Sequence, residues 1–411
     1  MFLIRRAQRD DLPTLMKLAK MVHFINLVAD RDIISHKIAH SRASFLKAAG
    51  LARREDAPRP VPRDAGPGSG EGLGDAVARS ELFMFVLEDS ETGNCIGTSQ
   101  LVSRMGGPGR PNVAFKLERR ELFSTSLQTG TSHVVARLHL DESAPTEIGG
   151  LILQPSFRGH KQRLGKLLSL VRFHYVGLYP HFFSDRILAE MMARISPDGV
   201  NTLWEFLGRR FIPLSYTEAD RFCQYSREFM LSLLPKGDIY LSLLPPEARS
   251  VVGEVGPETV PARRMLEKLG FQYRNIIDPF DGGPHLDAKT ADIEPVKQTR
   301  RLPLEALVKA GDCDRLGIVS YVDQDGEFRA IGARFAVLRS GGLGLVRKDA
   351  ALIQAEPGAV LGCTPIDGGA ELPASVAATG KRRAPTSKRT AGSKKAAANK
   401  NARRKSRRKA G

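Results

Sequence analysis

Long hydrophobic runs are missing from this sequence of 411 residues. No apolar stretch approaches the roughly 20 residues that a membrane-spanning helix needs. The first residues, MFLIRRAQRDDL, become charged too early for a signal peptide. We therefore expect a cytoplasmic protein without a membrane partner.

Cysteine and metal-binding patterns are scarce as well. The four cysteines lie far apart and form no C-x-x-C pair, which excludes a disulfide scaffold and a cysteine zinc site. His36 and His40 could share one face of a helix, but no H-E-x-x-H motif surrounds them. We expect reduced thiols, no metal site and no tightly bound cofactor.

Positive charge is abundant but unevenly distributed. Residues 380–411 contain 14 Lys and Arg and no acidic residue, so they carry most of the net charge of +17. Because this segment has almost no bulky apolar residue, we expect a disordered tail. Such a tail would bind nucleic acid or another polyanion without sequence preference. The alternative is a solubilising extension.

Alternating strand and helix patterns predict an α/β (α+β) core. The segment LFMFVLEDSETGNCIGTSQLV predicts two strands around a turn at residues 91–94, and NTLWEFLGRRF predicts a short helix capped by Asn201. AFKLE, VVARLHL and RILAEMM predict further strands. After residue 300, RLGIVSYV, EFRAIGARFAVL and GLGLVRKDAAL predict short strands of a small β-rich appendage.

The chain has room for two or three domains. We expect an N-terminal half at 1–145 with a mobile insertion at 51–80, a second half at 146–290, a small β-rich domain at 291–370 and a basic tail at 371–411.

The segment LILQPSFRGHKQRLGKLLSLVRF, residues 151–173, combines a basic loop with the start of a helix. Free backbone N–H groups and the helix dipole at such an N-terminus favour phosphate oxygens. Neither G-x-G-x-x-G nor G-x-x-x-x-G-K-[ST] occurs, so a Rossmann or P-loop site is disfavoured. We predict a phosphate or pyrophosphate site; a solvated basic turn is the alternative.

The order of these elements resembles the GNAT acyltransferase superfamily, and this resemblance implies a mixed sheet flanked by helices. More closely, LAEMM, LWEFLGRRF, EADRFC, LLPKGDIY, GEVGPETVPARRMLEKLGFQYRN and DPFDGGPHLDA resemble the arginine N-succinyltransferase family. This resemblance implies an acyl-CoA-dependent N-acyltransferase, with succinyl-CoA as co-substrate and arginine or a related amine as acceptor.

The same resemblance assigns a ligand to the basic loop. GNAT folds hold the pyrophosphate of acyl-CoA on a [Q/R]-x-x-G-x-[G/A] loop, which residues 162–167 match except at the last position. Leu151 matches a family position whose backbone lies against the acyl thioester. The implied CoA-binding residues of the loop are Arg158, Gln162, Arg163, Leu164, Gly165 and Lys166.

Two glutamates are candidates for the chemistry. Acyl transfer to an amine needs a group that takes the amine proton. Glu147 and Glu190 lie on predicted buried strands. Burying an ionised carboxylate is energetically unfavourable unless the group takes part in the chemistry or has a charged partner. Both residues also match family positions. Each could accept the proton or anchor the substrate; the alternative is an ion pair with Arg172 or Arg194.

Recognition of a guanidinium group calls for paired carboxylates. Asp278, Asp281 and Asp287 in DPFDGGPHLDA are the candidates. The alternative is an ordinary Asp-Gly-Gly-Pro turn.

One departure from the family concerns its proton donor. Family members carry a histidine in a G-x-V-H-P-x-T segment, where this chain has Gly256, and a second histidine is replaced by Gly237. Either another group, such as Glu258 or Tyr240, supplies the proton, or the substrate differs, or the enzyme is impaired. The prediction is an arginine N-succinyltransferase; the alternatives are a GNAT transferase for another amine and an impaired GNAT-like module tethered to nucleic acid. Self-association is left open.

Overall fold

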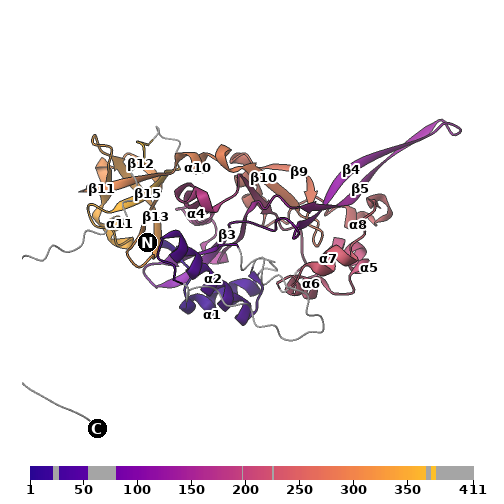
Figure 1. The fold of residues 1–411 in the computed structure, drawn as a ribbon, viewed down its shortest axis with the longest axis horizontal. Helices are drawn as coiled ribbons and strands as arrows, with labels where there is room; N and C mark the ends of the chain where they lie inside the picture. Colours follow the sequence, from indigo (N-terminus) through magenta and orange to yellow (C-terminus); the bar gives the residue numbers. More distant parts are fainter. Residues whose placement is uncertain (22–26, 54–79, 197, 225, 367–371, 376–411) are drawn as a thin grey trace, which may run out of the picture. The chain divides into compact units, whose positions relative to one another are not determined.

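Fifteen strands form one mixed sheet in the part of the chain that the structure describes (Figure 1). This computed structural model describes residues 1–21, 27–53, 80–196, 198–224, 226–366 and 372–375. The strands are β1 Phe2–Arg6, β2 Leu82–Asp89, β3 Asn94–Val102, β4 Asn112–Ser124, β5 Thr129–Asp141, β6 Thr146–Leu153, β7 Arg186–Glu190, β8 Ile239–Tyr240, β9 Gln272–Ile277, β10 Pro284–Lys289, β11 Arg300–Val308, β12 Arg315–Val322, β13 Phe328–Val337, β14 Leu343–Val346 and β15 Val360–Pro365. Their order is β12-β15-β11-β14-β13-β1-β2-β3-β6-β7-β10-β9-β4-β5-β8.

Helices pack on both faces of the sheet. They are α1 Leu12–Lys20, α2 Arg31–Ala48, α4 Leu164–Leu178, α5 Arg209–Phe211, α6 Tyr216–Phe222, α7 Glu228–Leu233, α8 Pro246–Arg249, α9 Val260–Lys268, α10 Glu294–Gln298 and α11 Arg347–Leu352. On β2, Phe83 and Phe85 pack in the core cluster that contains α4, whereas Met84 and Val86 pack in the cluster that contains α1. The expected mixed sheet flanked by helices is confirmed. None of the described helices is long and apolar enough to cross a membrane.

Strands β11 to β15 form the expected β-rich part around a core cluster of their own. This part joins the rest of the sheet where Ile4 of β1 pairs with Ala330 of β13. The strand expected throughout GLGLVRKDAAL is wrong for its second half, because Arg347–Leu352 is helix α11. Alanines favour a helix there, and Ala350 is buried against the cluster.

Residues 1–377 form one compact unit. Because a single sheet continues across the boundaries expected at 145/146 and 290/291, those boundaries stay predictions. The insertion and the basic tail lie almost wholly outside the described residues.

A second lobe is built on β4, β5 and β9. Its core cluster includes Phe115, Trp204 and Phe280, and the Trp204 and Phe280 rings are stacked with centroids 4.8 Å apart. The helix predicted here begins as expected, since the Asn201 side chain accepts a hydrogen bond from the Trp204 N–H at 2.8 Å. It continues as a π-helical turn, Trp204–Gly208.

The register of β6, β7 and β10 decides which side chains share a face. Glu147 lies opposite Leu188, and Glu190 lies opposite His285, so these residues project from the same face. The other face carries Ile148, Ile187, Ala189 and Leu286, which pack in the α4 cluster. The parallel pair β6–β7 is joined only at residues 146–147 and 187–188, although β6 runs on to Leu153. The two strands therefore separate beyond Glu147.

The turn between β9 and β10 is tied together by its own aspartates. Asp278 Oδ1 accepts hydrogen bonds from the N–H groups of Phe280 and Asp281. Asp281 accepts from Gly283 N–H at 2.7 Å and from Ala193 N–H at 2.8 Å, which fastens the turn to the segment after β7.

Gly283 fits this turn because it has no Cβ. A Cβ at this position would lie 1.9 Å from the carbonyl oxygen of Met191. We expect Gly283→Ala to lower the free energy of unfolding by at least about 2 kcal/mol, measured by urea denaturation. Gly311→Ala is the matched control, because a Cβ there meets nothing within 4 Å. Equal stabilities of the two variants would contradict this packing.

Candidate active site

Two carboxylates lie on one face of the sheet where β6 and β7 begin to separate. Glu147 on β6 is 2% exposed, and Glu190 ends β7. The strands expected around both residues are confirmed. Glu190 Oε1 accepts a hydrogen bond from Asn112 Nδ2 at 2.9 Å.

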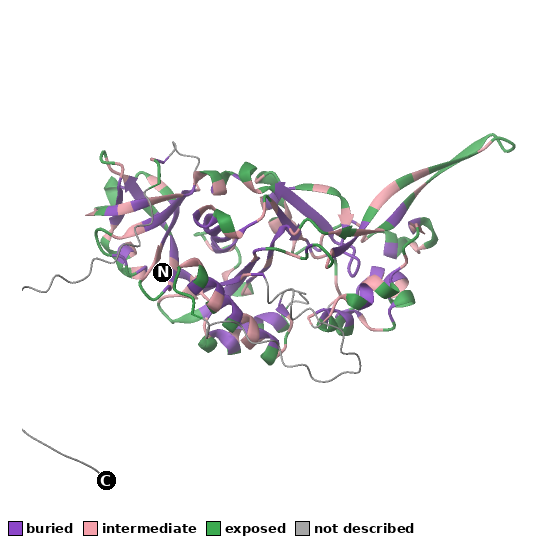
Figure 2. Cartoon of the chain, viewed as in Figure 1, coloured by how far each residue is buried: buried purple, intermediate pink, exposed green. Residues whose placement is uncertain are grey.

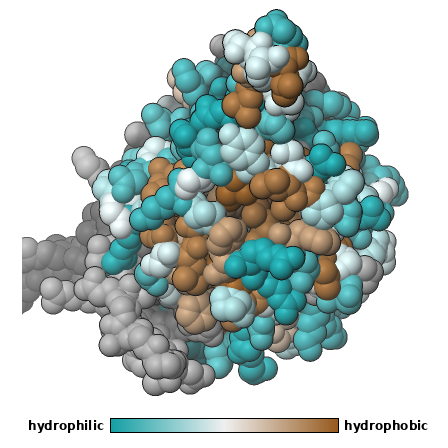
Figure 3. Space-filling view, turned by 90° about the vertical axis from the view of Figure 1, so that its right-hand side faces the viewer, coloured by the Kyte–Doolittle hydropathy of each residue, from teal (hydrophilic) through white to brown (hydrophobic). Residues whose placement is uncertain are grey.

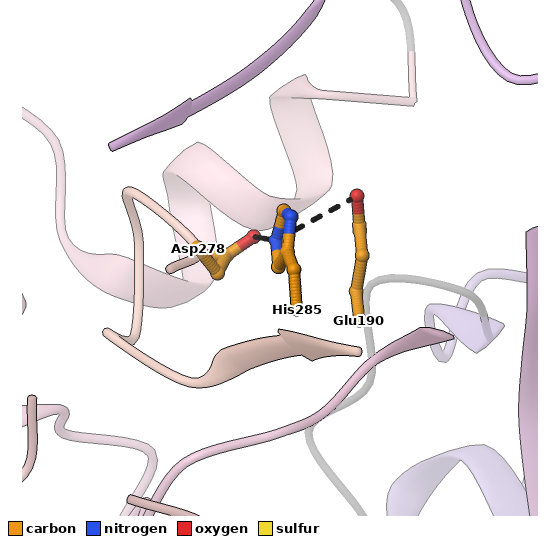
Figure 4. A group of neighbouring side chains, drawn as sticks. All are labelled: Glu190, Asp278 and His285. Carbon is orange, nitrogen blue, oxygen red and sulfur yellow. Dashed lines mark ion pairs between the residues drawn. The ribbon is translucent and has the colours of Figure 1, made fainter. Parts of the chain in front are cut away.

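His285 lies between Glu190 and Asp278 (Figure 4). Its Nε2 is 3.8 Å from Glu190 Oε1 and 3.9 Å from Asp278 Oδ2. The residue is 5% exposed, and its Nε2 has no hydrogen-bond partner among the described residues. Our sequence prediction missed His285. The signal was present, because strand alternation in PHLDA places His285 on the same face as Asp287.

The charge state of His285 is set by two opposing effects. Burial lowers its pKa, whereas the neighbouring carboxylates of Asp278, Glu190 and Asp281 raise it. The carboxylates prevail, so the pKa lies above its ordinary value. His285 is thus buried between two carboxylates that favour its protonated form.

The same three side chains offer ligand atoms for a metal ion, all within 4.8 Å of one another. A tetrahedral zinc ion with bonds of about 2.1 Å needs ligand atoms about 3.4 Å apart. Nε2 lies 3.8 Å and 3.9 Å from the two carboxylate oxygens. These distances are longer than the distance between two ligand atoms of a tetrahedral zinc site. We therefore describe it as an ion cluster.

Further charged groups approach this face from helix α2 and from the second lobe. Burial lowers the pKa of Lys37 to about 8, although Glu147 and Asp220 oppose this shift. Burial also raises the pKa of Asp220 to about 7. Arg227 Nη1 donates to Asn112 Oδ1 at 3.1 Å. The sequence did not indicate these groups, because they come from elements far apart in the chain.

A cavity opens beside the ion cluster. It has an empty volume of ≈ 260 Å³, which includes space open to solvent, and is lined by Asn112, Val113, Glu190, Cys223, Arg227, Met230, Asp278 and Phe280. The lining thus combines polar and charged groups with apolar side chains.

The basic loop leads from β6 to the N-terminus of α4, as expected. Arg163 precedes the helix in the left-handed conformation, with φ of 51°. The first helical amides have no partner within the helix, and the N–H of Leu167 bonds to the carbonyl of Arg163. Leu164 is buried, Leu151, Gly165 and Lys166 are half-buried, and Arg158, Gln162 and Arg163 are exposed.

The three candidate aspartates do not form one paired-carboxylate site, although Asp278 and Asp281 share the turn before β10. Asp278 belongs to the ion cluster, whereas both oxygens of Asp281 are bonded to backbone N–H groups. Asp287 pairs with Arg186 at 3.2 Å and Arg274 at 2.8 Å. A second cavity, of ≈ 320 Å³, lies between these arginines and His285.

Glu258 and Tyr240, which were suggested as substitutes for the missing histidine, lie outside the ion cluster. Glu258 is exposed and pairs with Arg158 of the basic loop at 3.4 Å. The Tyr240 ring contacts His133 on β5. A Cβ at Gly256 would lie 2.9 Å from the carbonyl oxygen of Ala193, so the backbone leaves little room for a histidine there.

Comparisons with known proteins agree on one family. A family model described as arginine N-succinyltransferase beta subunit matches residues 73–295. The arginine N-succinyltransferase of Citrobacter koseri is 31% identical over 305 residues, which cover 74% of this chain and 80% of that protein. The one from Escherichia coli O139:H28 is 34% identical over 228 residues, which cover 55% of this chain and 65% of that protein.

One solved structure has the same fold over nearly its whole length. It is arginine/ornithine succinyltransferase subunit AI from Pseudomonas aeruginosa, with 26% identity and a TM-score of 0.69. The match covers 89% of this chain and 98% of that chain.

The contacts in the ion cluster lead to a prediction about the pKa of His285. Glu190→Gln removes one of the charges that raise the pKa of His285, so that pKa should fall. The measurement is an NMR titration with ¹³C-labelled histidine, in which His285→Gln assigns the signal. Glu294→Gln, an exposed change in α10, should leave the titration unmoved. An unchanged His285 pKa in Glu190→Gln would show that the two groups do not interact.

Proposed function

The chain belongs to the arginine N-succinyltransferase family, and we propose that it transfers a succinyl group from succinyl-CoA to the α-amine of arginine. In this reaction the amine nitrogen forms a bond to the thioester carbonyl carbon, the C–S bond breaks and CoA leaves as a thiolate. The amine must lose a proton for the bond to form. The single observation that carries the proposal is the Glu190–His285 pair on the sheet face where β6 and β7 separate.

The basic loop fits acyl-CoA in the manner of GNAT enzymes. Strand β6 carries Glu147 near its start and ends at Leu153, directly before the loop. A ligand whose phosphates contact the α4 N-terminus and whose thioester follows β6 would reach the carboxylates. Exposed Arg158 and Arg163 would add charge-assisted contacts to the phosphate oxygens. The acyl group would then lie where the pairing of β6 and β7 ends.

His285 and Glu190 are suited to take the amine proton. Neutral His285 can accept a proton at Nε2, and the adjacent carboxylates stabilise the imidazolium that forms. In this chain the pair would do the work that the family assigns to a histidine at the position of Gly256. Glu147 and Asp278 add negative charge that favours a cationic substrate such as arginine.

A second candidate is the same reaction on another amine. The observation that favours it is Gly256, because a changed proton donor can accompany a changed acceptor. The solved relative is named for arginine and ornithine, so ornithine is the first alternative to compare. Binding of nucleic acid by residues 380–411 stays a prediction, since these residues lie outside the described part of the chain.

The test is an assay of free thiol with succinyl-CoA or acetyl-CoA as donor and arginine, ornithine or lysine as acceptor. We expect the highest kcat/KM for succinyl-CoA with arginine. Glu190→Gln should lower kcat by roughly 10²-fold to 10⁴-fold, the usual contribution of general acid-base catalysis, with little change in KM for the donor. Glu294→Gln should leave both constants unchanged.

Two outcomes would contradict the proposal. If no amine releases CoA above the hydrolysis background, the chain is not an N-acyltransferase. If Glu190→Gln retains full kcat, the ion cluster is not the site of proton transfer.

A further inference from the structure

Arg227 lines the cavity beside the ion cluster, and its guanidinium group is only partly satisfied there. The residue directly precedes helix α7 in the second lobe. Its Nη1 donates to Asn112 Oδ1 at 3.1 Å. Its Nε is shielded from solvent and has no hydrogen-bond partner among the described residues. Because a guanidinium group stays charged and only donates hydrogen bonds, this Nε–H calls for an acceptor that these residues do not supply.

Arg172 in α4 shows how the chain satisfies a buried guanidinium group elsewhere. Its Nε and Nη2 donate to the carbonyl oxygen and the hydroxyl of Ser169, at 3.1 Å and 2.6 Å. Its Nη1 donates to the carbonyl oxygen of Gly149 at 3.4 Å. Each nitrogen of Arg172 therefore has an acceptor. Since burying a charge without such partners is energetically unfavourable, the incomplete bonding of Arg227 points to a ligand.

The carboxylates near Arg227 are directed at His285. Burial lowers the pKa of Arg227, whereas Cys223 and the carboxylates around the cavity raise it. Glu190 Oε1 and Asp278 Oδ2 nevertheless lie beside His285 Nε2, at 3.8 Å and 3.9 Å. The cavity thus contains a cation at Arg227 that is separate from the ion cluster.

The lobe that carries Arg227 has an apolar core. Helices α6 and α7 combine buried and exposed residues (Figure 2), and their buried side chains Tyr216, Ala219, Phe229 and Met230 pack in that core. Seen end-on, apolar side chains also gather across the middle of the outer face (Figure 3). Apolar surroundings lower the local dielectric constant and strengthen an electrostatic contact. A carboxylate on Arg227 would therefore be held more strongly than on an exposed arginine.

Asn112 connects Arg227 to the ion cluster. Its Nδ2 donates to Glu190 Oε1 at 2.9 Å, and its Oδ1 accepts from Arg227 Nη1 at 3.1 Å. Across this one amide group, Glu190 Oε1 and Arg227 Nη1 are at most about 8 Å apart. A substrate whose carboxylate lies a few bonds from its reacting atom can span this distance.

We propose that Arg227 binds a substrate carboxylate and thereby selects the substrates of the site, an inference that rests on the proposed function. Two carboxylates of that reaction have the required chemistry. One ends the succinyl chain, two methylene groups from the thioester carbonyl, and the other is attached to the carbon that carries the amine of arginine. Either accepts charge-assisted hydrogen bonds from a planar guanidinium group. With its carboxylate on Arg227, the substrate has its reacting end beside His285.

The first test observes Arg227 itself in the full chain. In protein labelled with ¹⁵N-arginine, the Nε–H signal of Arg227 is the one that disappears from the NMR spectrum of Arg227→Lys. We expect this signal to shift with succinyl-CoA but not with butyryl-CoA, or with arginine but not with agmatine. Each pair differs only in the carboxylate, which butyryl-CoA replaces by a methyl group and agmatine by hydrogen. The pair that separates therefore identifies which substrate Arg227 binds.

The second test measures kcat/KM with the same four compounds. Arg227→Gln should lower kcat/KM roughly 10²-fold for the carboxylate-bearing member of the pair that separates, because a buried charged contact is lost. The value for the analogue without the carboxylate should not change. Arg227→Lys, which keeps the charge, should restore part of the preference. Arg209→Gln is the matched control, because Arg209 is exposed in the same lobe and pairs with Glu205; this variant should leave all four values unchanged.

A merely structural role of Arg227 gives a different result. It would lower kcat/KM equally for each substrate and its analogue, and this outcome would overturn the proposal. An Nε–H signal that shifts with no member of either pair, or with both members alike, would overturn it too. If the wild type transfers no acyl group at all, the proposed function fails, whereas the NMR comparison still decides whether Arg227 binds a carboxylate.

Discussion

A buried histidine held between two carboxylates is the interaction on which the site depends. Charges removed from water are stable only if each has a partner and the remaining polar atoms are bonded. The surrounding residues meet this condition for Glu190, which Asn112 contacts, and for Asp278, whose other oxygen holds the turn before β10. The backbone of that turn leaves room only for glycine at position 283. The close packing at Gly283 and the contacts of the two carboxylates therefore hold His285 in the same position.

The short pairing between β6 and β7 places this cluster where the two strands diverge. The two strands pair only at residues 146–147 and 187–188, whereas β6 stays paired with β3 and β7 stays paired with β10. Strand β6 then ends at the basic loop and the N-terminus of α4. One strand thus links the N-terminus of α4 to a pair of carboxylates, which is the arrangement that the proposed reaction of an acyl-CoA with a cationic amine would use.

Local patterns in the sequence predicted the elements that depend on neighbouring residues. The β2–β3 hairpin, the loop before α4 and the Asn201 cap were predicted correctly, because turn residues and helical spacing are encoded within a few positions. Strands β11 and β15 were not predicted, since their pairing is decided by distant strands. For the same reason the sequence suggested Glu147 and Glu190 but not His285, whose role follows from its register against β7. The grouping of Asp278, Asp281 and Asp287 came from proximity in sequence, and side-chain direction separates them.

The central claim is that His285, held between Glu190 and Asp278, accepts the amine proton. The most direct measurement is the pH dependence of kcat/KM for wild type and Asp278→Asn. His285 must be neutral to accept a proton, and its raised pKa places the acidic limb above pH 6.5, the ordinary value for histidine. Removing the Asp278 charge lowers that pKa, so the acidic limb should move to lower pH. An acidic limb at the same pH in both proteins would contradict the account.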